Sequence, residues 1–300
     1  MKAGWRVIVL CALLLDLVAP ATGGVRSVHA TGTDYLKVSY DEGSVPKDVR
    51  MYAGTTYSGT IGTWNISNTQ TDTDYIAAEQ GPGRNPGDYS LHFVSTAKNV
   101  QTARNNLGGT TGLTGKLELD ASLRMGSTTA RRDIQIRSLN GGSASATTNA
   151  NVISFADNGS INGADGQPLG SYEADAWYDV KLFVDNANGV VDYFVNGAYL
   201  GRRGLPAGWS NVRHVYLIQA YKNGQENHLY VDNVLLRDYV PVEGVTVPSD
   251  SLELPVGKSA SVAAGVAPAD ASDPRLTWTS SDPGVAEVNG GLVTGVGTGQ

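Results

Sequence analysis

The sequence predicts an all-β protein made of antiparallel sandwiches, and three observations support that fold class. Charged residues make up only 17% of the chain and 37 of its 300 residues are glycine, whereas about 25% charged residues and about 7% glycine are usual. Apolar and polar residues alternate with a period of two in many short segments, and no segment beyond the N-terminal region shows the 3.6-residue period of an amphipathic helix. Turn residues separate these segments, so the strands are expected to pair antiparallel.

The composition also excludes several classes of protein. A coiled coil or helical bundle would need more Ala, Glu, Lys and Leu, and a disordered chain would have too few Val, Leu, Ile, Tyr and Trp to build a core. The net charge is -7, and Lys and Arg occur in clusters no longer than a pair. Nucleic acids and anionic membrane surfaces are recognised by dense basic patches, so we expect neither as a partner.

Residues 1–30 are typical of a signal peptide. Lys2 and Arg6 form a positive n-region, residues 7–18 are mostly apolar, and residues 28–30 offer a cleavage site after Ala30. Cleavage near Ala21 is the alternative. The apolar stretch is shorter than the ~20 residues of a transmembrane helix. We therefore expect a secreted, extracellular protein without membrane insertion after cleavage.

The cysteine content points to a bacterial source. Cys11 is the only cysteine and lies inside the predicted signal peptide. Small extracellular modules of eukaryotes usually rely on disulfides. A secreted, β-rich chain without disulfides is more typical of bacteria. We expect this chain to be extracellular, either free or associated with the cell surface.

Individual strands follow from the alternation. In Lys116–Met125 the apolar residues occupy every second position, and the same holds for 178–184. A turn at 186–189 and the dipeptide Asn196-Gly197, which hairpins favour, enclose another strand at 191–195. Further strands are expected at 88–94, 131–137, 152–155, 212–221 and 228–236.

The composition changes near residues 240–244. Beyond this point aromatic residues almost vanish, and Ala, Val, Ser, Pro and Gly dominate. We therefore predict a signal peptide at 1–30, a first domain at 31–240 and a second β domain at 241–300.

The first domain contains three distinctive runs, namely WYDVKLFVD at 177–185, VDYFVNG at 191–197 and LYVDNV at 229–234. In these runs it resembles the concanavalin A-like, laminin G-like jelly-roll superfamily. It implies an antiparallel jelly-roll sandwich of the type found in secreted bacterial proteins that act on polysaccharides.

The second domain contains a series of short runs, namely GVTV at 244–247, LELPVGKS at 252–259, VAPADA at 266–271, TWTSSDP at 277–283, VAEV at 285–288 and GLVTG at 291–295. In these runs it resembles the bacterial immunoglobulin-like group 2 family. The resemblance implies a smaller immunoglobulin-like β-sandwich. Its last strand is apparently missing, because the family continues past the turn at 297–299; either the chain is a fragment or the domain is atypical.

No catalytic residues are predicted in these 300 residues. Laminarinase-type glucanases of the jelly-roll fold carry E-x-D-x-x-E on one strand, and Glu118 and Asp120 match its first two positions. The third position is Leu123, on the opposite face, so the proton donor is lacking. His92, His214 and His228 are scattered among strands, and the chain has neither G-x-S-x-G nor H-E-x-x-H.

A structural calcium ion is a further expectation from the jelly-roll resemblance. It implies ligands on the first and closing strands, at Asp41 or Glu42 and at Asp232. Calcium prefers six to eight oxygen ligands. The Asp/Asn-Gly loops at 157–159 and 165–166 are a second candidate, with simple turns as the alternative.

Glycan recognition would need aromatic rings with an exposed face. Loops are where such rings are commonly presented, and packing in the core is the alternative for each ring. The candidates in or beside predicted loops are Tyr57, Trp64, Tyr172, Trp209 and Tyr221.

The hypothesis that follows is a non-catalytic pair of modules. The first would bind or position a polysaccharide or cell-surface glycan, and the immunoglobulin-like module would serve as a spacer or adhesion element. Two alternatives stay open: an accessory part of a polysaccharide lyase or glycoside hydrolase with its catalytic domain downstream, and a structural cell-surface adhesion protein.

Overall fold

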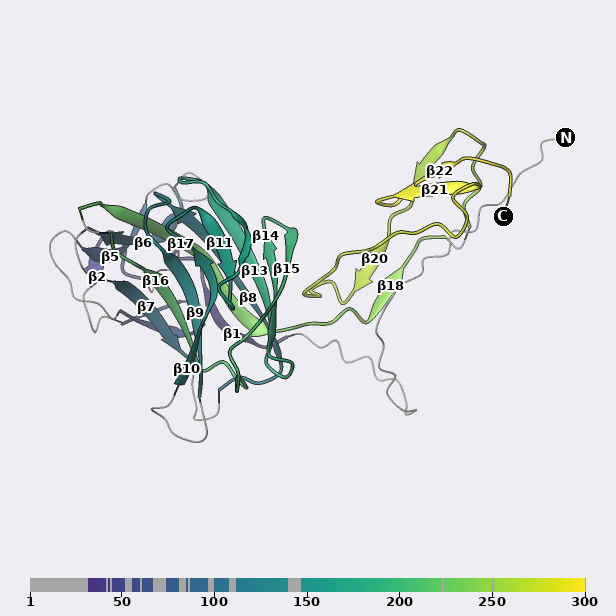
Figure 1. Ribbon diagram of the computed structural model, residues 1–300. Helices are drawn as coiled ribbons and strands as arrows, with labels where there is room; N and C mark the ends of the chain where they lie inside the picture. Colours follow the sequence, from purple (N-terminus) through teal and green to yellow (C-terminus); the bar gives the residue numbers. More distant parts are fainter. Residues whose placement is uncertain are drawn as a thin grey trace. The chain divides into compact units, whose positions relative to one another are not determined.

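The computed structural model divides the chain into two units, Gly32–Tyr239 and the residues from Val240 onward (Figure 1). The predicted signal peptide and Glu42 lie outside the described residues. The structure describes residues 32–41, 43, 45–51, 56–59, 61–66, 74–80, 85, 87–96, 100–107, 112–139, 147–222, 224–249 and 251–299.

The first unit consists of two antiparallel sheets, as the alternation predicts. The nine-stranded sheet has the order β15 (Ala198–Gly204), β14 (Val190–Val195), β13 (Trp177–Asp185), β8 (Lys116–Met125), β17 (Asn227–Asp238), β6 (Tyr89–Ser95), β5 (Tyr75–Gln80) and β2 (Arg50–Met51), with β1 (Asp34–Val38) also paired to β17. The eight-stranded sheet has the order β12 (Pro168–Ser171), β11 (Ser160–Gly163), β10 (Thr147–Phe155), β9 (Arg132–Leu139), β16 (His214–Gln219), β7 (Gln101–Asn106), β4 (Thr63–Ile66) and β3 (Thr56–Ser58).

Apolar side chains of both sheets form one buried cluster, so the unit is sandwich-like. Leu119, Leu182 and Val231 contribute to it from the nine-stranded sheet. Ile134 and Val215 contribute from the eight-stranded sheet. Because side chains alternate along a strand, the residues between these positions lie on the outer face of each sheet.

The hairpin between β14 and β15 has the predicted turn. Asn196 and Gly197 both have positive φ angles, 50° and 78°. A two-residue type I′ turn requires positive φ at both central positions, and Asn-Gly tolerates this at the least cost. The turn places β14 between β13 and β15.

β17 joins three strands and so organises the nine-stranded sheet. On one edge it pairs with β8, and on the other edge it pairs first with β6 and then with β1. The pairing with β8 shifts between Asp232 and Leu235, and Asn233 within this shift has a φ of 50°. An extra residue of this kind bends a strand, and here it lies where β17 changes partners from β6 to β1.

The second unit contains two small sheets and a small core. β18 (Gly244–Thr246) pairs with β20 (Gly265–Ala267). β22 (Leu292–Gly295) pairs with β19 (Ser259–Ser261) and β21 (Ala286–Asn289). The core is built on Ala286 and Val293. Trp278 is half-buried and lines an open hollow of about 440 Å³.

The all-β fold class is thus confirmed, because the described residues contain strands and no helix. No helix in this part of the chain is long and apolar enough to cross a membrane.

Candidate functional site

Two rows of polar residues cross the outer face of the eight-stranded sheet. Residues directly opposite in antiparallel strands share a face and lie about 5 Å apart. We call this surface the arginine face. Its first row consists of Asn149, Arg137 and His214, and its second row consists of Asn151, Gln135, Tyr216, Arg104 and Asn65.

The arginine face is held together by polar and ring contacts. The guanidinium of Arg137 lies over the ring of Tyr216, 3.9 Å from its centroid. Nε of Arg137 donates to Oε1 of Gln135 at 2.9 Å, and Nε2 of Gln135 donates to Oδ1 of Asn151 at 2.7 Å. These contacts place guanidinium and amide groups side by side on a rigid sheet.

Two nitrogen atoms on the arginine face are buried and have no hydrogen-bond partner. They are Nε of Arg104 and Nδ1 of His214. The pKa of His214 is lowered to about 4, first because burial penalises the charged ring and then because Arg213, Arg137 and Arg104 repel it. At neutral pH the imidazole is therefore uncharged, and the guanidinium groups of Arg137 and Arg104 on the face and of Arg213 directly before β16 lie near it.

The outer face of the nine-stranded sheet is different, because its charges pair with one another. Glu118 is 0% exposed and contacts both Lys181 and Arg237, the latter through Nε at 2.9 Å and Nη2 at 2.8 Å. Ser122 donates to Asp179 at 2.8 Å. The Glu118 carboxylate is therefore not exposed, because cations from β13 and β17 cover it.

Asp120 is a second carboxyl on that face. Its Oδ1 is buried without a hydrogen-bond partner. Burial and the charge of Glu118 raise the pKa of Asp120 to about 7, although Lys181 opposes the shift. Leu123, where the glucanase pattern needs its third carboxyl, points into the core as predicted.

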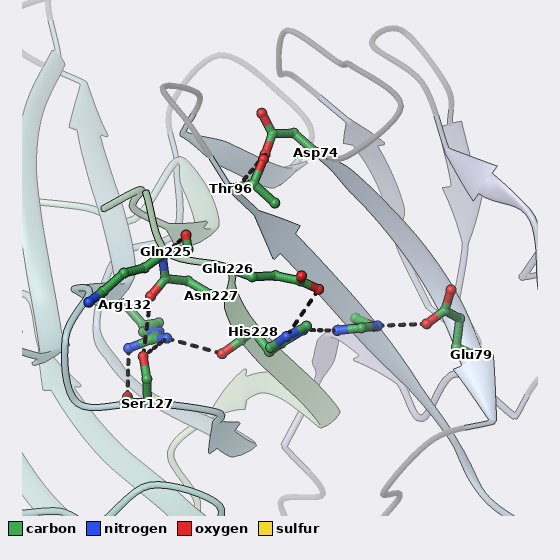
Figure 2. A network of polar contacts seen from close by, with 10 residues as sticks. Asp74, Glu79, Thr96, Ser127, Arg132, Gln225, Glu226, Asn227 and His228 are labelled. Atoms are coloured by element: carbon green, nitrogen blue, oxygen red, sulfur yellow. Dashed lines mark hydrogen bonds and ion pairs between the residues drawn. The ribbon is translucent and has the colours of Figure 1, made fainter. Parts of the chain in front are cut away.

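His92 and His228, which the sequence suggests are scattered, lie next to each other at one edge of this face. Nδ1 of His92 lies 2.6 Å from Oε2 of Glu79, and Nε2 of His92 lies 2.9 Å from Nδ1 of His228. Nε2 of His228 lies 3.4 Å from Oε1 of Glu226 (Figure 2). The ring of Tyr230 stacks on His92 at 4.2 Å. Burial lowers the pKa of His92 against the opposing effect of Glu79.

The same region contains a buried arginine, also drawn in Figure 2. Arg132 is 1% exposed and donates to Gln219 Oε1 at 2.9 Å, to the Ser127 carbonyl at 2.8 Å and to its Oγ at 3.1 Å. It also donates to the carbonyls of Ala130 and, at 3.2 Å, of His228. All of these acceptors are neutral. Arg132 therefore ties the loop before β9 to β16 and β17, and it is enclosed by protein.

Four of the five predicted aromatic residues are buried, which corrects the expectation that loops present them. Tyr57 and Trp64 lie on β3 and β4 with stacked rings, and Tyr172 packs edge-on against Phe155. Trp209 donates its Nε1 to Asn186 at 2.8 Å. A ring enclosed by the core has no free face for a sugar, so only Tyr221, which is 41% exposed, could offer one.

The predicted calcium ligands are placed in part. Oδ1 of Asp41 accepts from the Tyr89 amide at 3.0 Å, and Oδ1 of Asp232 accepts from the Asn233 amide at 2.7 Å. Glu42 is outside the described residues. Within the described residues no three His, Cys, Asp or Glu side chains form a group that could hold a metal ion. The loops at 157–159 and 165–166 are turns beside β11.

The arginine face was missed by sequence reasoning, although part of its signal is present. Gln135 and Arg137 alternate with isoleucines in one predicted strand, and His214 and Tyr216 alternate with apolar residues in another. Their outward direction is therefore readable. That these two strands are neighbours is not, because β9 and β16 are separated by six other strands in the chain.

Comparisons with solved structures return weak likenesses. A sialidase aligns with a TM-score of 0.45 and 13% identity, over 58% of this chain and 17% of that one. The Trypanosoma rangeli sialidase in complex with sialic acid aligns at 0.41 and 13%, over 74% and 33%. The binding domain of botulinum neurotoxin DC in complex with rat synaptotagmin II aligns at 0.43 and 8%, over 68% and 48%.

These likenesses carry no argument about function at such scores, and this chain spans less than half the length of each of the three proteins. No curated protein matches the sequence. Residues 241–300 match the model of the bacterial Ig-like domain (group 2). The comparisons thus identify a bacterial Ig-like domain (group 2) at residues 241–300, as the resemblance predicts.

Proposed function

We propose that this chain is a glycan-binding protein whose first unit binds a polysaccharide on the arginine face. The observation that carries the proposal is the pair of cross-strand rows, in which amide and guanidinium groups lie side by side on one rigid sheet. Sugar hydroxyl groups both donate and accept hydrogen bonds. Amides supply both roles, and a guanidinium supplies a planar set of donors.

The other broad face supports this function less well. Its carboxylates already accept from neighbouring cations, as Glu118 does from Lys181 and Arg237. A ligand would have to displace these partners. That face also has an unpartnered acceptor, Oδ1 of Asp120, whereas the arginine face has an unpartnered donor, Nε of Arg104.

The remaining parts of the proposal follow from the sequence. The first unit is a jelly roll of the concanavalin A-like, laminin G-like type, the chain is secreted by a bacterium through the signal at 1–30, and the Ig-like domain is a spacer or adhesion element. The runs quoted above and the family match at 241–300 support these points.

Binding of the purified chain to a panel of neutral, carboxylated and sulfated polysaccharides tests the proposal. We expect at least one dissociation constant below about 1 mM, which corresponds to about -4 kcal/mol. Each lost neutral hydrogen bond changes affinity by about 0.5–1.5 kcal/mol, so the double variant N149A/N151A should bind several-fold more weakly. Gln80→Ala on β5 is the matched amide control and should bind normally. Absence of binding, or equal binding by N149A/N151A, would refute the proposal.

A further inference from the structure

The arginines of the arginine face differ from five other arginines of the first unit, which lie beside carboxylates. Elsewhere in its described residues a carboxylate lies within ion-pair distance of Arg124, Arg131, Arg202, Arg203 and Arg237. None of the ion pairs found there includes Arg104, Arg137 or Arg213. In a chain of net charge -7, Arg104 and Arg137 on this face and Arg213 directly before β16, none of them in these ion pairs, form a local positive field.

The surroundings do not neutralise this field. The nearest carboxylate along the same strands is Asp133, which accepts from Ser154 at 2.6 Å and pairs with Arg131 at 3.0 Å. Arg213 donates to the Leu107 carbonyl. The charge on the face is therefore available to a ligand.

The unpartnered nitrogen of Arg104 indicates what kind of ligand would complete the face. Nε of Arg104 is a donor and is buried without a partner. A buried donor left without an acceptor is unfavourable, and an anionic oxygen is the strongest acceptor for a guanidinium. Arg104 lies opposite Tyr216 in the neighbouring strand, and the Arg137 guanidinium lies over the ring of the same Tyr216.

We propose that the arginine face selects an anionic glycan, whose carboxylate or sulfate oxygens accept hydrogen bonds from Arg104 and Arg137. This inference rests on the proposed function and adds the class of ligand. The amide rows contact the sugar hydroxyls, while the two guanidinium groups contact the charge. A guanidinium binds a carboxylate or a sulfate through two parallel hydrogen bonds, which also orients the sugar.

The same face is poorly suited to single-stranded nucleic acid. Proteins that bind such strands stack the bases on exposed aromatic rings. The ring of Tyr216 is only 6% exposed and is covered by Arg137. The surface therefore offers donors for oxygen atoms and no open ring for a base.

Polymers that share a backbone provide the test. Affinities of the full chain are measured for dextran, carboxymethyl dextran and dextran sulfate, and for agarose oligosaccharides against sulfated carrageenan oligosaccharides. We expect at least tenfold tighter binding of one or more charged polymers than of its neutral counterpart, and the carboxylated and sulfated arms show which group is preferred. A single-stranded DNA 20-mer is expected not to bind.

Single substitutions assign the preference to the face. Arg104→Gln and Arg137→Gln should each lose about tenfold in affinity for the charged polymer, with unchanged melting temperatures. Arg202→Gln, which removes an exposed arginine of β15, is the matched control and should bind as the parent does. If a variant does not fold, the anionic preference is tested by the affinity of the unsubstituted chain for the charged polymer at increasing salt concentration. Binding driven by charge must weaken steeply as the salt concentration rises.

Each outcome bears on one of the two proposals. Equal affinity for charged and neutral polymers, with loss in N149A/N151A, overturns the anionic preference and leaves glycan binding intact. Charged-polymer binding that survives both arginine substitutions, or tighter binding of DNA, also overturns it. Binding to no polymer overturns both.

Discussion

Replacing Arg132 with Met should lower the free energy of unfolding of the first unit more than substitution of any exposed residue does. Arg132 is enclosed and donates five hydrogen bonds to four residues, all through neutral acceptors. Methionine has a similar length and no donor. The substitution leaves the oxygens of Gln219, Ser127 and Ala130 without their charged donor inside the protein.

The magnitude follows from two opposing effects. Each buried acceptor left unpaired costs about 1–3 kcal/mol. In the opposite direction, removal of the cation relieves the desolvation penalty of burying a charge, the same penalty that lowers the pKa of Arg132. Three or more acceptors left unpaired, offset in part by that relief, give an expected net loss of about 3–5 kcal/mol. For a unit of this size it corresponds to a fall in melting temperature of roughly 10 °C.

Urea unfolding followed by tryptophan fluorescence measures the effect, because Trp64 is fully buried in the first unit. The neighbouring Arg131 is the matched control. Its side chain is 54% exposed and makes one ion pair, with Asp133, so Arg131→Met should change the free energy of unfolding by at most about 1 kcal/mol. A loss below 1 kcal/mol in Arg132→Met would show that water replaces the guanidinium and would refute this reasoning.

Three further predictions concern titratable groups. Because the pKa of Asp120 is raised to about 7, the contribution of this carboxyl to stability is fully present below pH 4 and is lost as the pH rises through 7. Asp120→Asn should therefore raise the free energy of unfolding more at pH 8 than at pH 4. An equal effect at both pH values would contradict this prediction. The ring of His214 should titrate near pH 4 in NMR spectra, with stability falling as the pH drops from about 6.5 to about 4; bound charged glycan should raise that midpoint, and a free-state midpoint near 6.5 would argue against the arginine cluster. If Asp41, Glu42 and Asp232 hold structural calcium, EDTA should lower the melting temperature and calcium should restore it, whereas a melting temperature indifferent to EDTA would exclude the ion.

The fold was predictable because strand alternation is a local property. Leu117 and Leu119 enter the core at every second position of β8, as the pattern predicts. The Asn196-Gly197 turn is likewise encoded by two adjacent residues with positive φ. Each feature depends only on neighbours in the sequence.

The candidate site was less predictable because it depends on which distant strands pair. His92 and His228 are 136 positions apart and meet only because β6 lies beside β17. Glu118 looks exposed in its own strand but is covered by cations from two other strands. Trp64 looks like a loop residue, yet β4 places it in the core. Pairing between distant strands, which the sequence does not encode locally, decides all three.

The arginine Nε–H resonances of the full chain provide the most direct test of the central claim, that an anionic glycan binds on the arginine face. Each guanidinium reports on its own sheet in a spectrum recorded with increasing amounts of a charged oligosaccharide. The account predicts that the signals of Arg104 and Arg137 shift first, while those of Arg202 and Arg237 on the nine-stranded sheet stay in place. Shifts confined to Arg202 and Arg237, with Arg104 and Arg137 unchanged at saturation, would contradict it.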